Sequence, residues 1–209
     1  MHSQPKEPHR TAGSVVLVSL PTWRACSSLF ALASIGAPLP LLCGATAGEE
    51  SARFDQFQVK AAYLYNFVRY VEWPPTRFSS PESPLVIGVS SASPLLPELQ
   101  RMIAGHQING RALLVRVCEN VEQARTTHLL FVQSSDQPWL VDELPSLQRA
   151  GILTVGESDL FAARGGIFVF VADGDRLRFK INLTEAQRAG LKVSSQLLKL
   201  ALSVSGKPR

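Results

Sequence analysis

Apolar side chains recur at steps of three and four residues between positions 54 and 72, which places them on one face of a helix. This face consists of Phe54, Phe57, Ala61, Leu64, Val68 and Val71. Lys60 interrupts the face, and we expect its alkyl chain to cover apolar surface while its ammonium group reaches solvent. Trp73 precedes Pro74, a position that disfavours helical geometry, so we expect the helix to end near Glu72.

After this helix, short apolar runs alternate with amphipathic segments. The runs predict strands at 85–89, 112–118, 128–132 and 151–156. Helices are predicted at 94–104 with Ser93 as the cap, at 138–149, as single turns from Ser158 and Thr184, and at 193–204 with Ser194 or Ser195 as the cap. Segments 167–172 and 176–182 flank an Asp-Gly-Asp turn, which predicts a β-hairpin. This order predicts a single α/β domain with a mixed β-sheet flanked by helices.

The first 47 residues have the pattern of a secretory signal peptide. A basic region is followed by an uncharged stretch from Ala25 to Leu42 and then by Ala45-Thr46-Ala47, so we expect cleavage after Ala47. Two alternatives remain open. A membrane anchor would need a longer apolar run without the two prolines that interrupt this one. A lipoprotein would use Cys43, but bulky Leu42 precedes that residue.

Cleavage defines the expected domain organisation. The signal peptide spans 1–47, a short polar lead-in 48–53, the α/β domain 54–204 and a C-terminal tail 205–209. The leader carries three basic residues and one acidic residue, so its removal lowers the formal net charge from +4 to about +2. The remaining chain has no basic stripe, and this argues against a nucleic-acid partner.

The expected exported domain contains one cysteine, Cys118, because Cys26 and Cys43 lie in the leader. A single cysteine in an exported protein is a buried thiol, an intermolecular bridge or a reactive site. Apolar residues precede Cys118 in a predicted strand, which favours the buried thiol. No intramolecular disulfide is expected.

The chemistry of an enzyme is not evident in the sequence. His106 and His128 are the histidines of the expected domain, and neither stands at a metal-ligand spacing from another histidine or cysteine. The chain lacks a nucleophile elbow and a phosphate-binding loop. We therefore expect no catalytic residues, no metal and no cofactor.

The aromatic segment from Ala61 to Pro75 supplies both core and candidate surface. With Leu64 at the centre of the apolar face, Phe67 lies inside it and Tyr65 lies on one flank beside Arg69. Tyr, Trp and Arg are enriched at binding hot spots, so Tyr65, Arg69 and Trp73 are candidate partner-binding residues. The alternative is that a neighbouring loop covers Tyr65 and that Trp73 closes the end of the helix.

A small-molecule site is a second hypothesis. Ligands of α/β sheets bind at the carboxyl ends of the strands. Two predicted strand-to-helix junctions would line such a crevice and could offer helix N–H groups to an anion. Their candidate pocket residues are Ser90, Ser91, Gly156, Glu157 and Ser158.

Several separated blocks of the chain resemble the YfiR-like family of periplasmic regulators. The blocks are 59–67 (VKAAYLYNF), 71–74 (VEWP), 153–157 (LTVGE), 165–167 (GGI), 178–183 (RFKINL) and 189–201 (AGLKVSSQLLKLA), and together they span most of 54–204. Their number and order make the resemblance more specific than one motif.

The resemblance implies a non-enzymatic periplasmic regulator. Such a protein binds the periplasmic sensor part of an inner-membrane diguanylate cyclase and holds it inactive, which lowers cyclic-di-GMP and biofilm formation. It also implies a homodimer, and an outer-membrane, peptidoglycan-associated lipoprotein that sequesters the regulator. Under this hypothesis Arg69, Arg164 and Arg176 would orient the partner. The family's paired cysteines are missing, because only Cys118 remains after cleavage.

Overall fold

The computed structural model describes residues 47–90, 93–133 and 138–206, with only the backbone described for 47–55, 138 and 139. The signal peptide, apart from Ala47, and the candidate Ser91 lie outside these residues. The helices are α1 (Ala47–Tyr70), η1 (Pro75–Arg77), α2 (Leu95–Ile103), α3 (Val121–Arg125), α4 (Pro138–Asp142), α5 (Leu144–Arg149), α6 (Asp159–Ala163), α7 (Leu183–Arg188) and α8 (Ser195–Leu200). The strands are β1 (Val71–Glu72), β2 (Leu85–Val89), β3 (Gln107–Ile108), β4 (Arg111–Val117), β5 (Leu129–Val132), β6 (Leu153–Gly156), β7 (Phe168–Asp173), β8 (Arg176–Asn182), β9 (Lys192–Val193) and β10 (Ser203–Ser205).

The main sheet has the strand order β10-β8-β7-β6-β5-β2-β4-β3. Strands β4, β2, β5, β6 and β7 are parallel, whereas β8 and β3 are antiparallel to their neighbours β7 and β4. The parallel part is doubly wound, because the chain reverses its direction of growth after β4 and continues at β5 on the other side of β2. The predicted fold class, a mixed α/β sheet, is confirmed.

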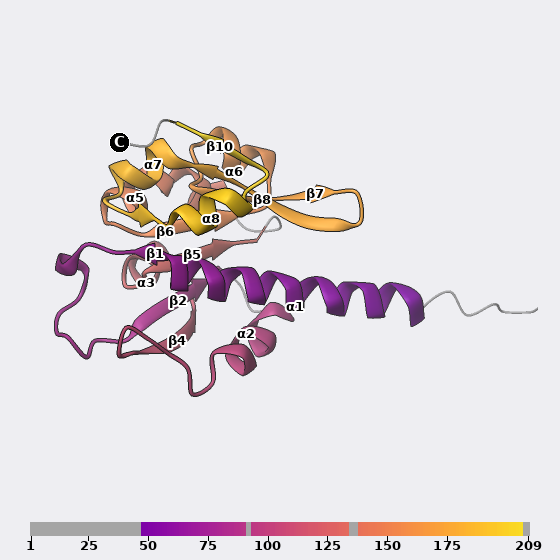
Figure 1. The fold of residues 1–209 in the computed structure, drawn as a ribbon, viewed down its shortest axis with the longest axis horizontal. Helices are drawn as coiled ribbons and strands as arrows, with labels where there is room; N and C mark the ends of the chain where they lie inside the picture. The colour runs from indigo at the N-terminus through magenta and orange to yellow at the C-terminus, as the bar shows by residue number, and fades with distance from the viewer. Residues whose placement is uncertain (1–46, 91–92, 134–137, 207–209) are drawn as a thin grey trace, which may run out of the picture. The chain divides into compact units, whose positions relative to one another are not determined.

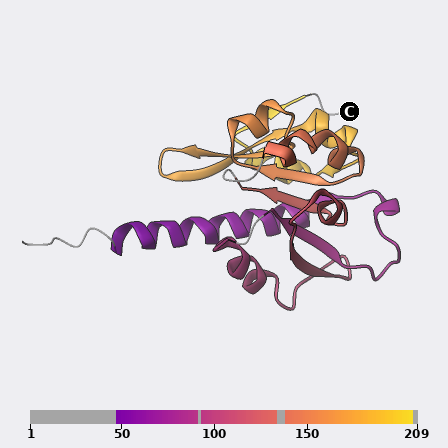
Figure 2. The same cartoon turned by 180° about the vertical axis from the view of Figure 1, so that it is seen from behind.

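Helices cover both faces of the sheet. On one face, α1, α2, α7 and α8 form a core cluster with alternate strand residues such as Leu129 and Phe131. On the other face, α3, α4, α5 and α6 pack against the intervening residues, including Leu130 and Val132. Figure 1 and the reverse view in Figure 2 show α1 continuing past the ends of the parallel strands in the same direction as the β7–β8 hairpin.

The first helix differs from its prediction at both ends. It begins at Ala47, so residues 48–53 are helical and not a separate polar lead-in. It ends at Tyr70 because Val71 and Glu72 form an antiparallel pair with Val193 and Lys192 of β9. The pattern of the sequence could not indicate this end, since the partner strand lies more than a hundred residues away.

The last predicted helix is also shorter. Helix α8 stops at Leu200, and Ser203–Ser205 forms strand β10 parallel to β8. The cap is Ser194, whose hydroxyl accepts the amide of Gln196 at 3.2 Å. Ser93 does not cap α2 through its hydroxyl; its carbonyl accepts the amide of Leu96 instead. The short elements α3, β1, β3 and β9 were not predicted, because tertiary pairing defines them more than local pattern.

The predicted helix at 138–149 is divided into α4 and α5. The break lies at Glu143, just before α5, whose first turn contains Pro145. Proline has no amide hydrogen and its ring crowds the preceding turn, so one continuous helix through it is disfavoured. The predicted hairpin is present, with Asp173 of β7 paired to Arg176 of β8 and a positive φ of 58° at Gly174.

Candidate functional site

A buried ion pair joins α1 to the carboxyl edge of the parallel strands. The ammonium group of Lys60 donates to Oε2 of Glu157 at 2.7 Å, and these side chains are 8% and 17% exposed. Glu157 directly follows β6, so the pair fixes the position of α1 over this edge. The expectation that Lys60 extends to solvent is wrong. A charge on the apolar face of a helix was the signal, but its partner could not be predicted.

Beyond this ion pair, α1 and the β7–β8 hairpin enclose a groove of about 410 Å³. Its lining comes from Gln56 and Val59 of α1 and from residues of the hairpin, namely Ala172, Gly174, Asp175, Arg176 and Leu177. In Figure 1, α1 and the β7–β8 hairpin both reach past the ends of the neighbouring strands. We call this feature the hairpin groove. Tyr63 of α1 contacts one lining residue, because its hydroxyl donates to the carbonyl of Leu177 at 3.0 Å.

The hairpin groove combines apolar and charged groups that are open to solvent. Val59 is 43% exposed, which is high for a large apolar residue of a helix that otherwise packs on the sheet. Arg176 is exposed at the start of β8, and among the described residues it takes part in no ion pair. An accessible arginine beside apolar surface is suited to protein recognition.

Tyr65 and Arg69 lie away from the hairpin groove. Tyr65 is half-buried and its ring meets the ring of His106 edge-on, with centroids 5.6 Å apart. Arg69 is exposed, near Tyr70 and beside a hollow that Lys192 also lines. Ten residues separate Arg69 from Val59, so they stand about 15 Å apart along the helix. Tyr65 and Arg69 therefore do not contribute to one surface with Arg176.

Trp73 belongs to the core. Its side chain is 8% exposed, and its indole N–H donates to the carbonyl of His128 at 3.0 Å. This buried position agrees with the alternative interpretation of the sequence, in which Trp73 closes the end of the helix. We do not keep Trp73 in the proposed contact surface, because a buried and hydrogen-bonded indole cannot contact a partner without local unfolding.

Arg164 lies apart from both the hairpin groove and the region of Arg69. It follows α6 and donates to the carboxylate of Asp142 in α4 at 2.6 Å. Both side chains are more than half exposed, and such surface pairs contribute little to stability. The structure consequently does not bring Arg69, Arg164 and Arg176 together.

The candidate pocket residues hold the structure together at the strand ends. Glu157 pairs with Lys60, and the hydroxyl of Ser158 accepts the amide of Phe161 at 3.1 Å as the cap of α6. A Cβ at Gly156 would lie 2.6 Å from the ring of Phe161, so glycine is required by close packing. The hydroxyl of Ser90 accepts the amide of Gln133 at 3.2 Å. These internal contacts do not favour a small-molecule crevice.

His128 is buried in an environment that keeps it neutral. Burial and the charges of Arg77 and Arg111 lower the pKa of His128 to about 4, against the opposing effect of the Arg77 carbonyl. Its Nδ1 accepts the amide of Val86 at 3.1 Å, and its ring stacks on Phe78 with centroids 4.7 Å apart. These contacts give His128 a structural role at the start of β5.

Cys118 has the environment of an inert thiol. It is fully buried, and burial raises its pKa to about 11 despite the nearby charge of Arg116. The thiolate is the reactive form, so this environment suppresses oxidation and exchange. Of the three alternatives left open by the sequence, the structure favours the buried thiol.

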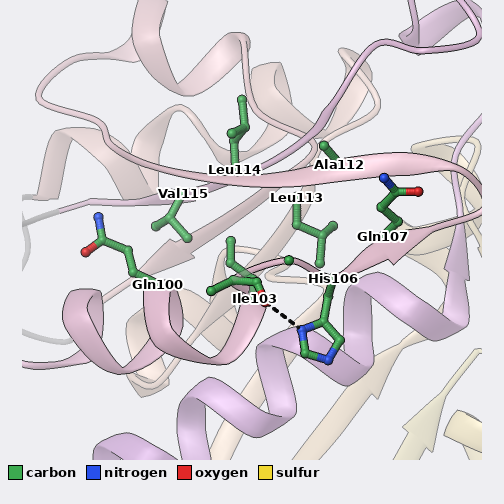
Figure 3. Close-up of a pocket in the computed structure, with 10 residues that line it drawn as sticks. Gln100, Ile103, His106, Gln107, Ala112, Leu113, Leu114 and Val115 are labelled. Atoms are coloured by element: carbon green, nitrogen blue, oxygen red, sulfur yellow. Dashed lines mark hydrogen bonds between the residues drawn. The ribbon is translucent and has the colours of Figure 1, made fainter.

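A second hollow, of about 380 Å³, lies at the opposite edge of the sheet and was missed by the sequence analysis. It is lined by the end of α2 and the outer side of β4, including Gln100, Ile103, His106, Leu113 and Val115 (Figure 3). Leu114 of the same strand is 47% exposed. We call this feature the edge hollow. Only the strand order reveals that β4 is nearly the outermost strand.

Within the described part of the chain, no helix combines the length and the apolar character that crossing a bilayer requires. Over the same residues, no three side chains of His, Cys, Asp or Glu are grouped as metal ligands would be.

Comparison with known families identifies the chain. The model of the YfiR/HmsC-like family matches residues 57–202, a range that begins in α1 and ends just before β10. The chain belongs to the YfiR/HmsC-like family. Membership of this family suggests a periplasmic regulator of diguanylate cyclase signalling. No curated protein matches its sequence.

Solved structures show more distant similarity. An ABC domain from Streptococcus pneumonia in complex with L-Trp is 15% identical, with a TM-score of 0.42 over 57% of this chain and 56% of that chain. A conserved domain protein from Vibrio cholerae is 14% identical, with a TM-score of 0.42 over 71% of this chain and 60% of that chain. The chain thus spans somewhat more than half the length of each of these structures.

Proposed function

We propose that this protein binds the periplasmic sensor part of an inner-membrane diguanylate cyclase and holds the enzyme inactive, which lowers cyclic-di-GMP. The family match carries this proposal, and it covers Val59 of α1 and the whole β7–β8 hairpin. The groove adds a physical basis for binding, since it offers Arg176, for which no ion pair is found within the described part of the chain, beside exposed apolar surface. The protein acts by binding and not by catalysis.

The same proposal includes export and regulation. The leader is removed after Ala47, and the remaining chain acts in the periplasm as a homodimer. An outer-membrane, peptidoglycan-associated lipoprotein sequesters it and so restores cyclase activity and biofilm formation. Cys118 does not control this cycle by disulfide exchange, because its thiol is buried.

The test is capture of the cyclase from detergent-solubilised host membranes. The exported protein serves as bait, and mass spectrometry identifies what is retained. We expect a membrane diguanylate cyclase among the retained proteins. Overproduction of the bait should also lower cellular cyclic-di-GMP. A folded bait that retains no cyclase above background, and that leaves cyclic-di-GMP unchanged, would contradict the proposal.

Arg176→Glu tests whether the hairpin groove is the contact. Reversal of a charge at an interfacial arginine should weaken cyclase binding roughly tenfold or more, while the melting temperature stays within a few degrees because the side chain is exposed. The matched control is Arg149→Glu, an exposed arginine in the last turn of α5. Equal binding by both variants would place the contact elsewhere on the protein.

A further inference from the structure

The outer side of β4 is an open sheet edge over most of its length. Strand β4 spans seven residues, and β3 pairs only with Arg111 and Ala112. Leu113 to Val117 pair with β2 on one side, and no other described strand pairs with them on the opposite side. A row of unpaired backbone groups of this kind is a template for another strand.

The orientation of the backbone shows which groups are available. The amide of Cys118 donates to the carbonyl of Val89 in β2 at 2.8 Å. Successive residues of a strand direct their backbone groups to alternate sides. The amides and carbonyls of Val117, Val115 and Leu113 therefore point away from β2, toward the open side.

The edge hollow provides space for side chains of an added strand. In Figure 3, Leu113 and Val115 lie on the side of β4 that faces Ile103, whereas Leu114 points to the opposite side. A strand placed beside β4 would direct every second side chain toward this hollow, above Ile103 and Gln100. Apolar side chains of moderate size fit this position, because Ile103, Leu113 and Val115 provide apolar lining.

The other face of the edge carries a positive charge. Arg116 is exposed on the same side as Leu114 and donates to the hydroxyl of Thr126 at 2.8 Å. Within the described residues it has no ion-pair partner. An acidic side chain on the neighbouring strand would meet this charge, since cross-strand pairs of opposite charge are favourable.

We propose that the β4 edge binds an extended peptide segment of a partner protein, in which apolar residues alternate with acidic ones. The backbone of the segment pairs with Leu113, Val115 and Val117. Its apolar side chains enter the edge hollow and an acidic side chain meets Arg116. This inference rests on the proposed protein-binding function and assigns it a second surface, separate from the hairpin groove.

Charge favours such a segment over a second copy of this chain. Two β4 strands paired with each other over Leu113–Val117 would bring both copies of Arg116 to one short ladder without supplying an acid. Like charges close together across a ladder are destabilising. A partner segment with Glu or Asp meets the same edge without this repulsion.

The experiment measures binding of two five-residue peptides to the protein exported from the full chain. One is N-acetylated Val-Glu-Val-Glu-Val and the other is Val-Lys-Val-Lys-Val, each with a fluorophore and an amidated C-terminus. Fluorescence anisotropy should show the Glu peptide binding about fivefold more tightly, as expected for one exposed ion pair. Hydrogen exchange should show the amides of Val115 and Val117 becoming protected when the Glu peptide is bound.

Two variants make the result decisive. Arg116→Glu should reverse the preference, so that the Lys peptide binds more tightly. Val115→Pro removes an outward amide without removing one that donates to β2, and it should abolish binding of both peptides. Arg116→Glu alters no core residue, so it remains informative even if Val115→Pro fails to fold.

The outcomes separate this inference from the proposed function. Equal binding of the two peptides, or an unchanged preference in Arg116→Glu, would overturn the edge proposal. So would a dimer in light scattering that Val115→Pro converts to monomer, with no peptide binding by either form. Because the peptide experiment contains no cyclase, a failure of cyclase capture leaves its result unaffected, and the reverse also holds.

Discussion

The two halves of α1 are attached to the sheet by different forces. The carboxyl-terminal half is held by apolar packing, since Leu64, Phe67 and Val68 are fully buried. The amino-terminal part of the described side chains is held by the ion pair of Lys60 with Glu157 and by partly buried Phe57, next to exposed Val59. One helix therefore has a core half, and a half that remains available to a partner beside the hairpin groove.

The comparison teaches that an exposed binding wall can be fixed by very few contacts. Apolar burial would have fixed the amino-terminal half more strongly, but it would have covered the groove. A buried ion pair positions the helix and leaves its outer face open. Such a pair contributes to placement more than to net stability, because desolvation of the two charges offsets their attraction.

The largest expected effect comes from the core half. Phe67→Ala should lower the free energy of unfolding by about 4 kcal/mol, because a buried aromatic ring leaves a cavity. The ring of Phe67 lies within 6 Å of those of Tyr63, Phe168, Phe170 and Phe179, measured between centroids. Urea unfolding followed by circular dichroism measures the change. The matched variant is Val59→Ala, for which we expect less than about 0.5 kcal/mol. Similar losses in the two variants would refute the distinction between the halves.

The ion pair should give the next largest effect. Lys60→Ala leaves the carboxylate of Glu157 buried without a cation, so we expect a loss of about 3 kcal/mol. The double variant Lys60→Met with Glu157→Gln removes both charges and should recover most of this stability. Because methionine keeps the packing of the lysine stem, a double variant as unstable as Lys60→Ala would show that the attraction of the pair itself, and not the unpaired charge, explains the loss.

The stability of the core should also depend on pH, because the core contains buried His128 next to Trp73. Burial lowers the folded-state pKa of His128 to about 4, below its ordinary value of 6.5. The unfolded state therefore binds the proton first as pH falls, and stability contributed by neutral His128 is lost between about 6.5 and 4. From pH 7 to pH 5 this single residue should remove about 2 kcal/mol.

His128→Asn isolates this effect. The amide oxygen of asparagine can accept the amide of Val86 in place of Nδ1, and the side chain does not titrate. Denaturant unfolding at a series of pH values should show a smaller loss of stability in the variant between pH 7 and 5. An identical pH dependence in both proteins would show that other groups cause it.

Local patterns allowed much of the fold to be predicted. The core face of α1, the hairpin about Asp173-Gly174 and the central strands all follow from spacing between near neighbours. The site was predicted less well. Arg176 lies at the hairpin groove, whereas Trp73 is in the core and Arg164 is paired elsewhere. Sequence type identifies residues suited to binding, but exposure depends on what packs against them.

By itself, the sequence determined the α/β class, the apolar face of α1, the family and the single cysteine of the expected exported domain. Only the tertiary structure decided that Lys60 meets Glu157, that Trp73 is buried, and that β4 lies at an open edge. The reason is physical. Backbone periodicity is set by neighbours a few residues apart, whereas Lys60 and Glu157 are separated by 97 residues and meet only when the whole sheet has formed.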